Sequence, residues 1–336
     1  MNRDLLNKLV FDQIDQLYGL VRAIADTYLV DARSLAAALI LVYLSVKAYG
    51  IMTGDERFEI MPLVRPFGIV LVILLWQPFI DVLEAPILAL ENKSEQFTEA
   101  KIDRVNQLYK IRNDRLTDLY TKLWSETSEL EDAKEDDSFF PSLPSIEEFR
   151  NKINAAFVYL QAKLKWALYA VLEFIVIMLF QGMIYLIFYL KVIIAGLLIA
   201  LGPFAFAVSI IPGFRSSYLK WISRFVSTLL YGVMGYIVLL VALTHVENAV
   251  SREIATLNVI LQGTPESDVL FYVYTAGHNS SEYSFIVALL VGALGMLAVP
   301  IISNWIITSA SSSSVANKAV NAAQTAAAAG TKLIGI

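Results

Sequence analysis

The stretch WALYAVLEFIVIMLFQGMIYLIFYLKVIIAGLLIALGPFAFAVSII, residues 166–211, carries only two charged side chains, Glu173 and Lys191. Water cannot surround an apolar surface of that length, whereas the hydrocarbon core of a bilayer, about 30 Å thick, takes roughly 20 apolar residues per helix. The stretch is therefore long enough for two membrane-spanning helices, and we expect them to join near Lys191. Lipid is the medium that this segment requires.

The rest of the chain holds four more apolar blocks of spanning length, at residues 34–51, 63–83, 225–245 and 284–308. Together with residues 166–211 they predict an all-α fold, a polytopic membrane helical bundle of about six transmembrane helices. Pro78 lies inside the second block, where it should kink the helix and free a carbonyl that a neighbouring helix must satisfy. Gly202-Pro203 should bend the fourth span for the same reason.

Composition divides the chain into five segments. An amphipathic helix precedes the first two spans, a polar segment follows them, and the remaining spans lead to a tail rich in alanine and serine. The predicted boundaries are 1–33 for the amphipathic helix, 34–83 for the first two spans, 84–165 for the polar segment, 166–308 for the four-span domain and 309–336 for the tail.

The polar segment 84–165 is predicted to be a helical hairpin beside the membrane. Steps of three and four residues form one heptad seam, which indicates a long helix; its members are Ile102, Val105, Tyr109, Arg112, Leu116, Leu119 and Leu123. Ser145-Ile146-Glu147-Glu148 matches a capping box and predicts that a second helix begins there. The seam is suited either to packing within the hairpin or to docking of another subunit.

The overall composition agrees with a membrane protein. Hydrophobic residues make up 57% of the chain and the mean hydropathy is +0.60, above the roughly 45–50% apolar content of soluble domains. The net charge of −5 gives no global attraction for nucleic acid. The absence of cysteine excludes disulfides and thiolate chemistry. Acids at Asp4, Asp12 and Asp15 interrupt the N-terminal region, so we expect no signal peptide and insertion through the first span.

The sequence offers no constellation for catalysis, so we expect no enzyme activity, no cofactor and no metal site. The two histidines, His245 and His278, are about 30 residues apart, and no pair of histidines has the four-residue spacing of a zinc helix. No glycine-rich loop ends in Lys-Ser or Lys-Thr to hold a phosphate. The serines at 311–314 have no neighbouring base that would activate a hydroxyl.

Intramembrane polar groups are the better candidates, because each is costly at a helix centre unless it is paired or hydrated. Glu173 and Gln181 are eight residues apart and share a helix face. They could form a stripe facing a lumen or an ion. The alternative, which the sequence favours, is that Glu173 extends to the interface while Gln181 bonds a neighbouring helix.

Orientation follows from the basic link after the fourth span. Arg215, Lys220 and Arg224 are accompanied by no acid, which predicts a cytoplasmic location. Counting back over two crossings, the hairpin and the N-terminus should be cytoplasmic as well. These three cations could contact a phosphate backbone or a partner protein, although the ordinary explanation for them is topology and anionic lipid.

The stretch Leu197-Leu198-Ile199-Ala200-Leu201-Gly202-Pro203-Phe204, followed by Ile211-Pro212-Gly213-Phe214 and then Trp221 and Arg224, resembles the TrbL-type polytopic inner-membrane subunits of type IV secretion and conjugation systems. Length and tail make the TraJ transfer proteins of conjugative transposons the nearest likeness. The motif positions are Gly202, Pro203, Pro212, Gly213 and Trp221.

The resemblance implies a non-catalytic channel or platform subunit in the bacterial cytoplasmic (inner) membrane that assists transfer of DNA or protein. It implies as partners other secretion-system subunits, including ATPases, with membrane lipid around the spans and transient contact with the transferred DNA. Close small residues such as Gly232 and Gly235 allow tight helix packing within the chain or between copies, and we expect a homo-oligomer. Two other hypotheses stay open: a secondary transporter or ion channel, and a structural anchor for another complex.

Overall fold

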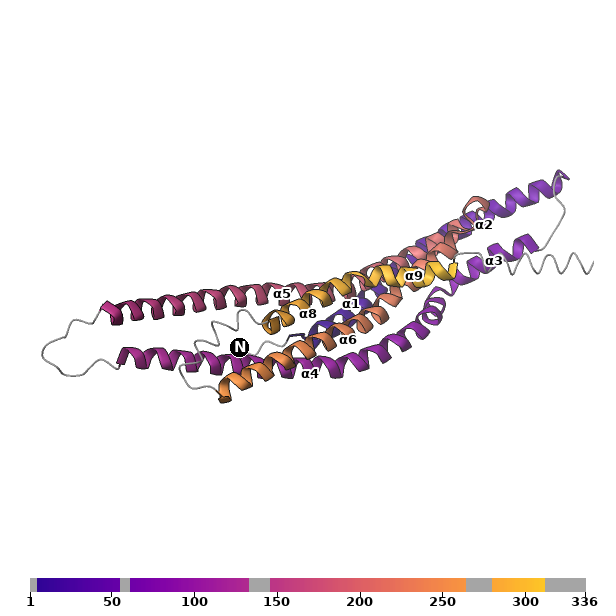
Figure 1. Cartoon of the computed structure of the whole chain (residues 1–336). Coiled ribbons are helices and arrows are strands. Elements are labelled where there is room, and N and C mark those ends of the chain that lie inside the picture. The colour runs from indigo at the N-terminus through magenta and orange to yellow at the C-terminus, as the bar shows by residue number, and fades with distance from the viewer. Residues whose placement is uncertain (1–4, 55–60, 133–145, 264–279, 312–336) are drawn as a thin grey trace, which may run out of the picture. The chain divides into compact units, whose positions relative to one another are not determined.

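The structure, a computed structural model, describes residues 5–54, 61–132, 146–263 and 280–311 (Figure 1). Within these ranges every regular element is a helix, which confirms the all-α prediction. The helices are α1 (Lys8–Thr27), α2 (Leu29–Met52), α3 (Met61–Leu74), α4 (Trp76–Asp132), α5 (Ile146–Val208), α6 (Ser217–Gly263), α8 (Ser280–Leu297) and α9 (Val299–Ser311), with a 3-10 turn η1 (Pro212–Phe214) between α5 and α6.

Four helical segments are long and apolar enough to cross a membrane: Lys8–Met52, Ala167–Val208, Pro212–Gln262 and Tyr283–Ile307. A fifth results if the bent pair Val64–Leu74 and Trp76–Leu119 is one span. The chain is therefore a helical membrane protein, as its composition predicts, with four or five such spans among the described residues where the sequence indicated about six.

The difference in number arises at residues 166–211. The sequence predicts two helices that join near Lys191, whereas α5 runs without interruption to Val208. Lys191 does not end the helix because its ammonium is buried and neutralised by Glu91 of α4, 2.5 Å from Nζ. Gly202-Pro203 does not end it either. The prediction of two helices that join near Lys191 is therefore wrong.

The second predicted span does contain a sharp bend, but it lies at Leu75. The axes of α3 and α4 differ by 82°, and Pro78 occupies the first turn of α4, where a backbone N–H has no helical partner in any case. The carbonyl of Leu74, four residues before Pro78, accepts a hydrogen bond from Arg33 of α2 at 3.0 Å. A neighbouring helix thus supplies the missing donor.

After the apolar block 225–245 the sequence predicts a loop over residues 246–283, whereas α6 continues through the block as far as Gly263. Its extension is amphipathic, and Val246, Val250, Leu257 and Ile260 are buried. A hydropathy window misses such a segment because only one face is apolar. His245 is therefore an exposed residue within a helix. His278, Ser145 and the tail from residue 312 lie outside the described residues.

The described chain forms two compact units, and α1, α4, α5 and α6 contribute to both. One unit comprises 1–15, 92–189 and 235–297; the other comprises 16–91, 190–234 and 298–336. The first is here called the seam unit, because it contains the predicted heptad seam of α4. The second is called the aromatic unit, because Trp76, Phe206, Trp221 and Phe225 are buried in its core.

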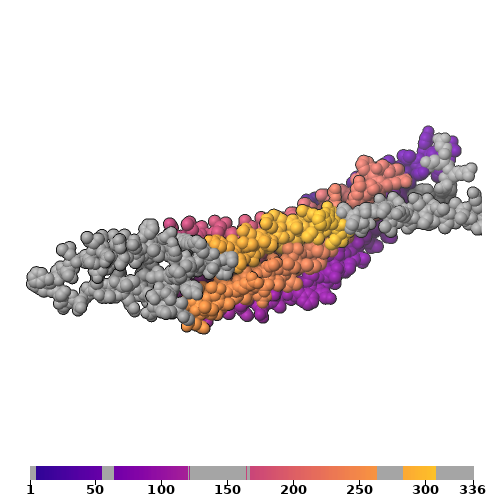
Figure 2. All heavy atoms as spheres, viewed as in Figure 1, coloured from indigo at the N-terminus to yellow at the C-terminus, as the bar shows by residue number. Residues whose placement is uncertain are grey.

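In the seam unit the predicted seam is a buried face of α4. Ile102, Val105 and Leu119 are at most 6% exposed, and Leu119 packs against Leu257 and Ile260 of α6. Residues 235–263 of α6, orange in Figure 2, lie between α4 and α8 on the face drawn there. The seam is thus covered by helices of the same chain.

Candidate functional site

The heptad seam of α4 extends further upstream than the apolar residues indicate. The same alternation of three and four continues through polar positions, which are Gln77, Asp81, Glu84, Glu91, Glu95 and Thr98. A seam position faces a partner helix whatever its chemistry, so polar residues there must find polar partners. The structure supplies these partners in both units.

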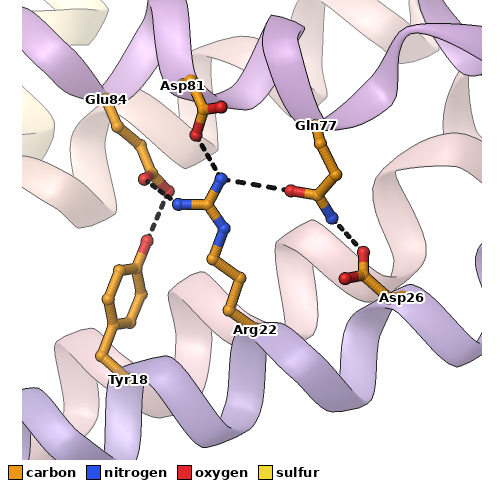
Figure 3. Close-up of polar contacts among 6 residues, drawn as sticks. All are labelled: Tyr18, Arg22, Asp26, Gln77, Asp81 and Glu84. Atoms are coloured by element: carbon orange, nitrogen blue, oxygen red, sulfur yellow. Dashed lines mark hydrogen bonds and ion pairs between the residues drawn. The ribbon is translucent and has the colours of Figure 1, made fainter.

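In the aromatic unit, α1 faces the upstream seam with residues spaced four apart (Figure 3). Arg22 is central: its Nη1 lies 3.2 Å from Glu84 Oε2 and its Nη2 lies 3.1 Å from Gln77 Oε1. The remaining contacts are an ion pair from Arg22 to Asp81, a hydrogen bond from the Tyr18 hydroxyl to Glu84, and one from the Gln77 amide to Asp26. Since Glu84 is 1% exposed, the guanidinium and the phenol replace its hydration.

A second buried pair follows two turns along the seam of the same unit. Lys191 Nζ of α5 lies 2.5 and 2.6 Å from the two carboxylate oxygens of Glu91, and both residues are 7% exposed. The ammonium is also 6.0 Å from the centroid of the Tyr18 ring. Gly232 of α6 leaves the space that the carboxylate occupies, because a Cβ there would overlap Glu91. The glycine and the ion pair therefore depend on each other.

In the seam unit the polar position is Arg112, whose side chain is fully buried. Its Nη1 and Nη2 lie 2.7 and 2.9 Å from the two oxygens of Glu173 on α5. Its Nε lies 2.8 Å from Glu253 on α6. Further along the same two helices, Lys101 and Arg104 of α4 both pair with Glu247 of α6.

Glu173 and Gln181 do not act on a common partner. Glu173 turns to Arg112, whereas the Gln181 amide donates to the carbonyl of Leu5 at 2.6 Å. Both are bonded to other segments of the same unit. Among the described residues, no three histidine or acidic side chains gather in a way that could hold a metal ion.

The Gly202-Pro203 motif lies in the aromatic unit, where its glycine permits close packing. A Cβ on Gly202 would lie 2.7 Å from the Trp221 ring and would also overlap Trp76. The two indoles are 5.1 Å apart between ring centroids, and Trp221 Nε1 donates to the carbonyl of Leu198 at 2.8 Å. Trp221 thus fixes the start of α6 against α5.

Pro212 and Gly213 form the η1 turn that carries the basic link. Arg215, Lys220 and Arg224 are all exposed. The turn is fastened by Arg65 of α3, which donates to the carbonyl of Arg215 at 2.7 Å and stacks 5.6 Å from the Tyr218 ring centroid. The structure therefore presents Arg215 at the end of a fixed turn, and Lys220 and Arg224 in the first turns of α6.

Sequence reasoning identified Glu173 but missed its partner and the whole upstream set. The heptad pattern includes Arg112 as one member of a largely apolar seam, and composition assigns Glu84 and Glu91 to the polar hairpin. The sequence does contain a signal for these residues. If the alternation of three and four residues is extended back to Gln77, then Glu84, Glu91 and Arg112 all fall on the buried seam of α4.

The apolar helices of spanning length and the ion pairs buried among them define a polytopic α-helical membrane protein. The chain belongs to the family of homologues of TraJ from Bacteroides conjugative transposon, whose family model matches residues 8–335. This membership confirms the likeness to the TraJ transfer proteins and implies a role in the transfer of a conjugative transposon. No curated protein matches the chain, and no solved structure does.

Proposed function

We propose that this protein is a non-catalytic platform or channel subunit of the type IV secretion system of a conjugative transposon. It lies in the bacterial inner membrane, as a TrbL-type subunit does, and helps DNA or protein to cross the envelope. The energy comes from ATPase partners. Family membership over residues 8–335 carries the proposal, since transfer of a conjugative transposon requires a path through the membrane for its DNA.

The internal pairing of the buried ionisable groups supports a platform. Glu173 places both carboxylate oxygens on Arg112, and Glu91 places both on Lys191. A transporter needs ligands that exchange between protein and solute, whereas these carboxylates hold helices together. The rival hypothesis predicts that purified protein in liposomes moves a solute and that Glu173→Gln reduces the flux.

The unbroken α5 supports an external location for the central segment. If α5 crosses the bilayer once, the residues before and after its apolar part lie on opposite sides. Arg215, Lys220 and Arg224 then mark the cytoplasmic side, and the segment around residues 84–165 faces away from it. In that arrangement the three cations are available to anionic lipid, to an ATPase or to the transferred strand.

Deletion of the gene tests the proposal in mating cells. We expect transfer of the element to fall to background while growth of the donor is unchanged, and we expect the wild-type gene to restore transfer. A deletion strain that transfers the element at the normal frequency would refute the proposal. Photocrosslinking from Lys220 during mating would show whether DNA or an ATPase contacts the basic link.

A further inference from the structure

The ion cluster of Arg112, Glu173 and Glu253 contains one acid more than it has cations. Arg112 is the one cation within ion-pair distance of either carboxylate among the described residues. The side chain of Arg112 is 0% exposed, that of Glu173 12% and that of Glu253 7%. If both acids were ionised, a buried site would hold an uncompensated negative charge, and buried groups avoid this by taking up a proton.

The geometry distinguishes the two carboxylates. Glu173 receives two charge-assisted hydrogen bonds from the guanidinium, at 2.7 and 2.9 Å, the arrangement that an ionised carboxylate prefers. Glu253 approaches only Nε, at 2.8 Å, and neither this Nε nor the facing Oε2 has a hydrogen bond of good geometry. Glu173 is thus the ionised partner, and Glu253 is the acid that remains.

Among the described residues, the other groups recorded in contact with the cluster are a phenol, an amide and an aromatic ring, none of which carries a positive charge. On α4 they are the Tyr109 hydroxyl, which faces Glu173, and the Asn113 amide. On α8 the Phe285 ring lies 4.6 Å from the guanidinium carbon of Arg112. Arg115 follows Arg112 on α4, but its side chain is 43% exposed and forms an ion pair with Asp118.

We propose that Arg112, Glu173 and Glu253 form a one-proton binding site in which Glu253 is a neutral carboxylic acid at neutral pH. The site holds Glu173⁻, Arg112⁺ and one proton on Glu253, so its net charge is zero. Loss of that proton leaves one buried negative charge where α4, α5 and α6 meet in the seam unit.

A neighbouring cluster on α4 and α6 has the opposite stoichiometry, with more cations than acids, and it provides the control. Glu247 faces two cations, Lys101 and Arg104, and Arg104 is 69% exposed. The acid is therefore ionised and any excess charge is hydrated. Glu247→Gln therefore removes an ionised carboxylate from α6, the helix that also carries Glu253, and leaves the protonated Glu253 unchanged.

Infrared difference spectra of purified protein in nanodiscs test the proton directly. At pH 7, wild type minus Glu253→Gln should show the carbonyl band of a protonated carboxylic acid, and wild type minus Glu247→Gln should not. Glu173→Gln should abolish the band as well, because Glu253 then becomes the ionised partner of Arg112. Absence of the band in wild type, or its retention in Glu173→Gln, would overturn the proposal.

Thermal unfolding gives a second measurement that uses the same variants. Each single Glu→Gln change leaves the cluster neutral and should be tolerated, whereas Glu173→Gln with Glu253→Gln leaves Arg112 unpaired and should lower Tm far more than the sum of the singles. A large fall in Tm in both single variants would contradict the proposal. A Tm that depends on Na⁺ would also contradict it, because a bound cation would then replace the proton.

The pH dependence has a definite sign. The folded site holds one proton that an unfolded carboxyl group releases above about pH 4.3, so the stability that this site contributes falls as pH rises. Glu253→Gln removes this dependence, and its Tm should exceed that of wild type by a margin that grows from pH 5 to pH 8. A constant margin would contradict the proposal. These readouts are independent of DNA transfer, so they can fail while the transfer role stands.

Discussion

The two buried ion pairs that Lys191 and Arg112 make differ in how each charge is compensated. In the aromatic unit Lys191 meets one carboxylate, so the pair is neutral by itself. In the seam unit Arg112 meets two, and neutrality requires a proton. The cation is buried in both, with a side chain 9% exposed for Lys191 and 0% for Arg112. Stoichiometry, rather than burial, therefore decides whether a buried charge in this protein is purely structural or also titrates.

Breaking the balanced pair should have the largest effect. Lys191→Met leaves Glu91 buried without its cation, which typically costs about 3–5 kcal/mol. We expect little protein in the membrane and no transfer, measured by immunoblot of carbonate-washed membranes and by mating frequency. Lys93→Met, at an exposed position of α4, is the matched control for the loss of one lysine. Normal levels of the Lys191→Met protein would contradict the structural role of the pair.

Filling the space at Gly202 should have the next largest effect. Gly202→Leu must displace Trp76 and Trp221, and overpacking of this kind costs about 1–3 kcal/mol. We expect a lower Tm in detergent and reduced transfer. Gly182→Leu is the matched control on the same helix, because nothing lies within 4 Å of its Cβ position. Equal effects of the two substitutions would show that Gly202 is not a packing site.

Removing the donor at the bend should cost less. Arg33→Met leaves the Leu74 carbonyl without the hydrogen bond at 3.0 Å, a loss of about 1–3 kcal/mol if water cannot replace it. Tm should fall, and spin labels placed on α2 and α3 should report a broader distance distribution. An unchanged distribution would mean that Pro78 and packing alone maintain the 82° bend.

Neutralising the basic link should change stability least. Arg215→Gln, Lys220→Gln and Arg224→Gln together remove exposed charges, and exposed substitutions are usually within about 0.5 kcal/mol. We expect the Tm to be unchanged, whereas the orientation of the protein in the membrane or the transfer frequency should be altered. Accessibility labelling of a cysteine at Ser128 in this cysteine-free chain reads the orientation. A large fall in Tm would show that these side chains are structural.

The sequence predicted the class of fold and the seam of α4, because hydropathy and periodicity are local properties of the chain. It failed at Lys191 and at residues 246–263, where a partner helix decides the outcome. A lysine in an apolar run indicates a loop unless a carboxylate such as Glu91 neutralises it. The amphipathic end of α6 resembles a loop unless α4 covers it. The pairing of Arg112 with Glu253 joins residues that no local pattern connects.

The double variant Glu91→Gln with Lys191→Met measures most directly whether the buried pairs of this protein are structural. It removes both charges at once, so no uncompensated charge stays buried. We expect it to recover the membrane level and the transfer frequency that Lys191→Met loses. If the double variant accumulates normally in the membrane and still fails to transfer DNA, the charges serve transport itself and the account of a platform held together by paired charges is contradicted.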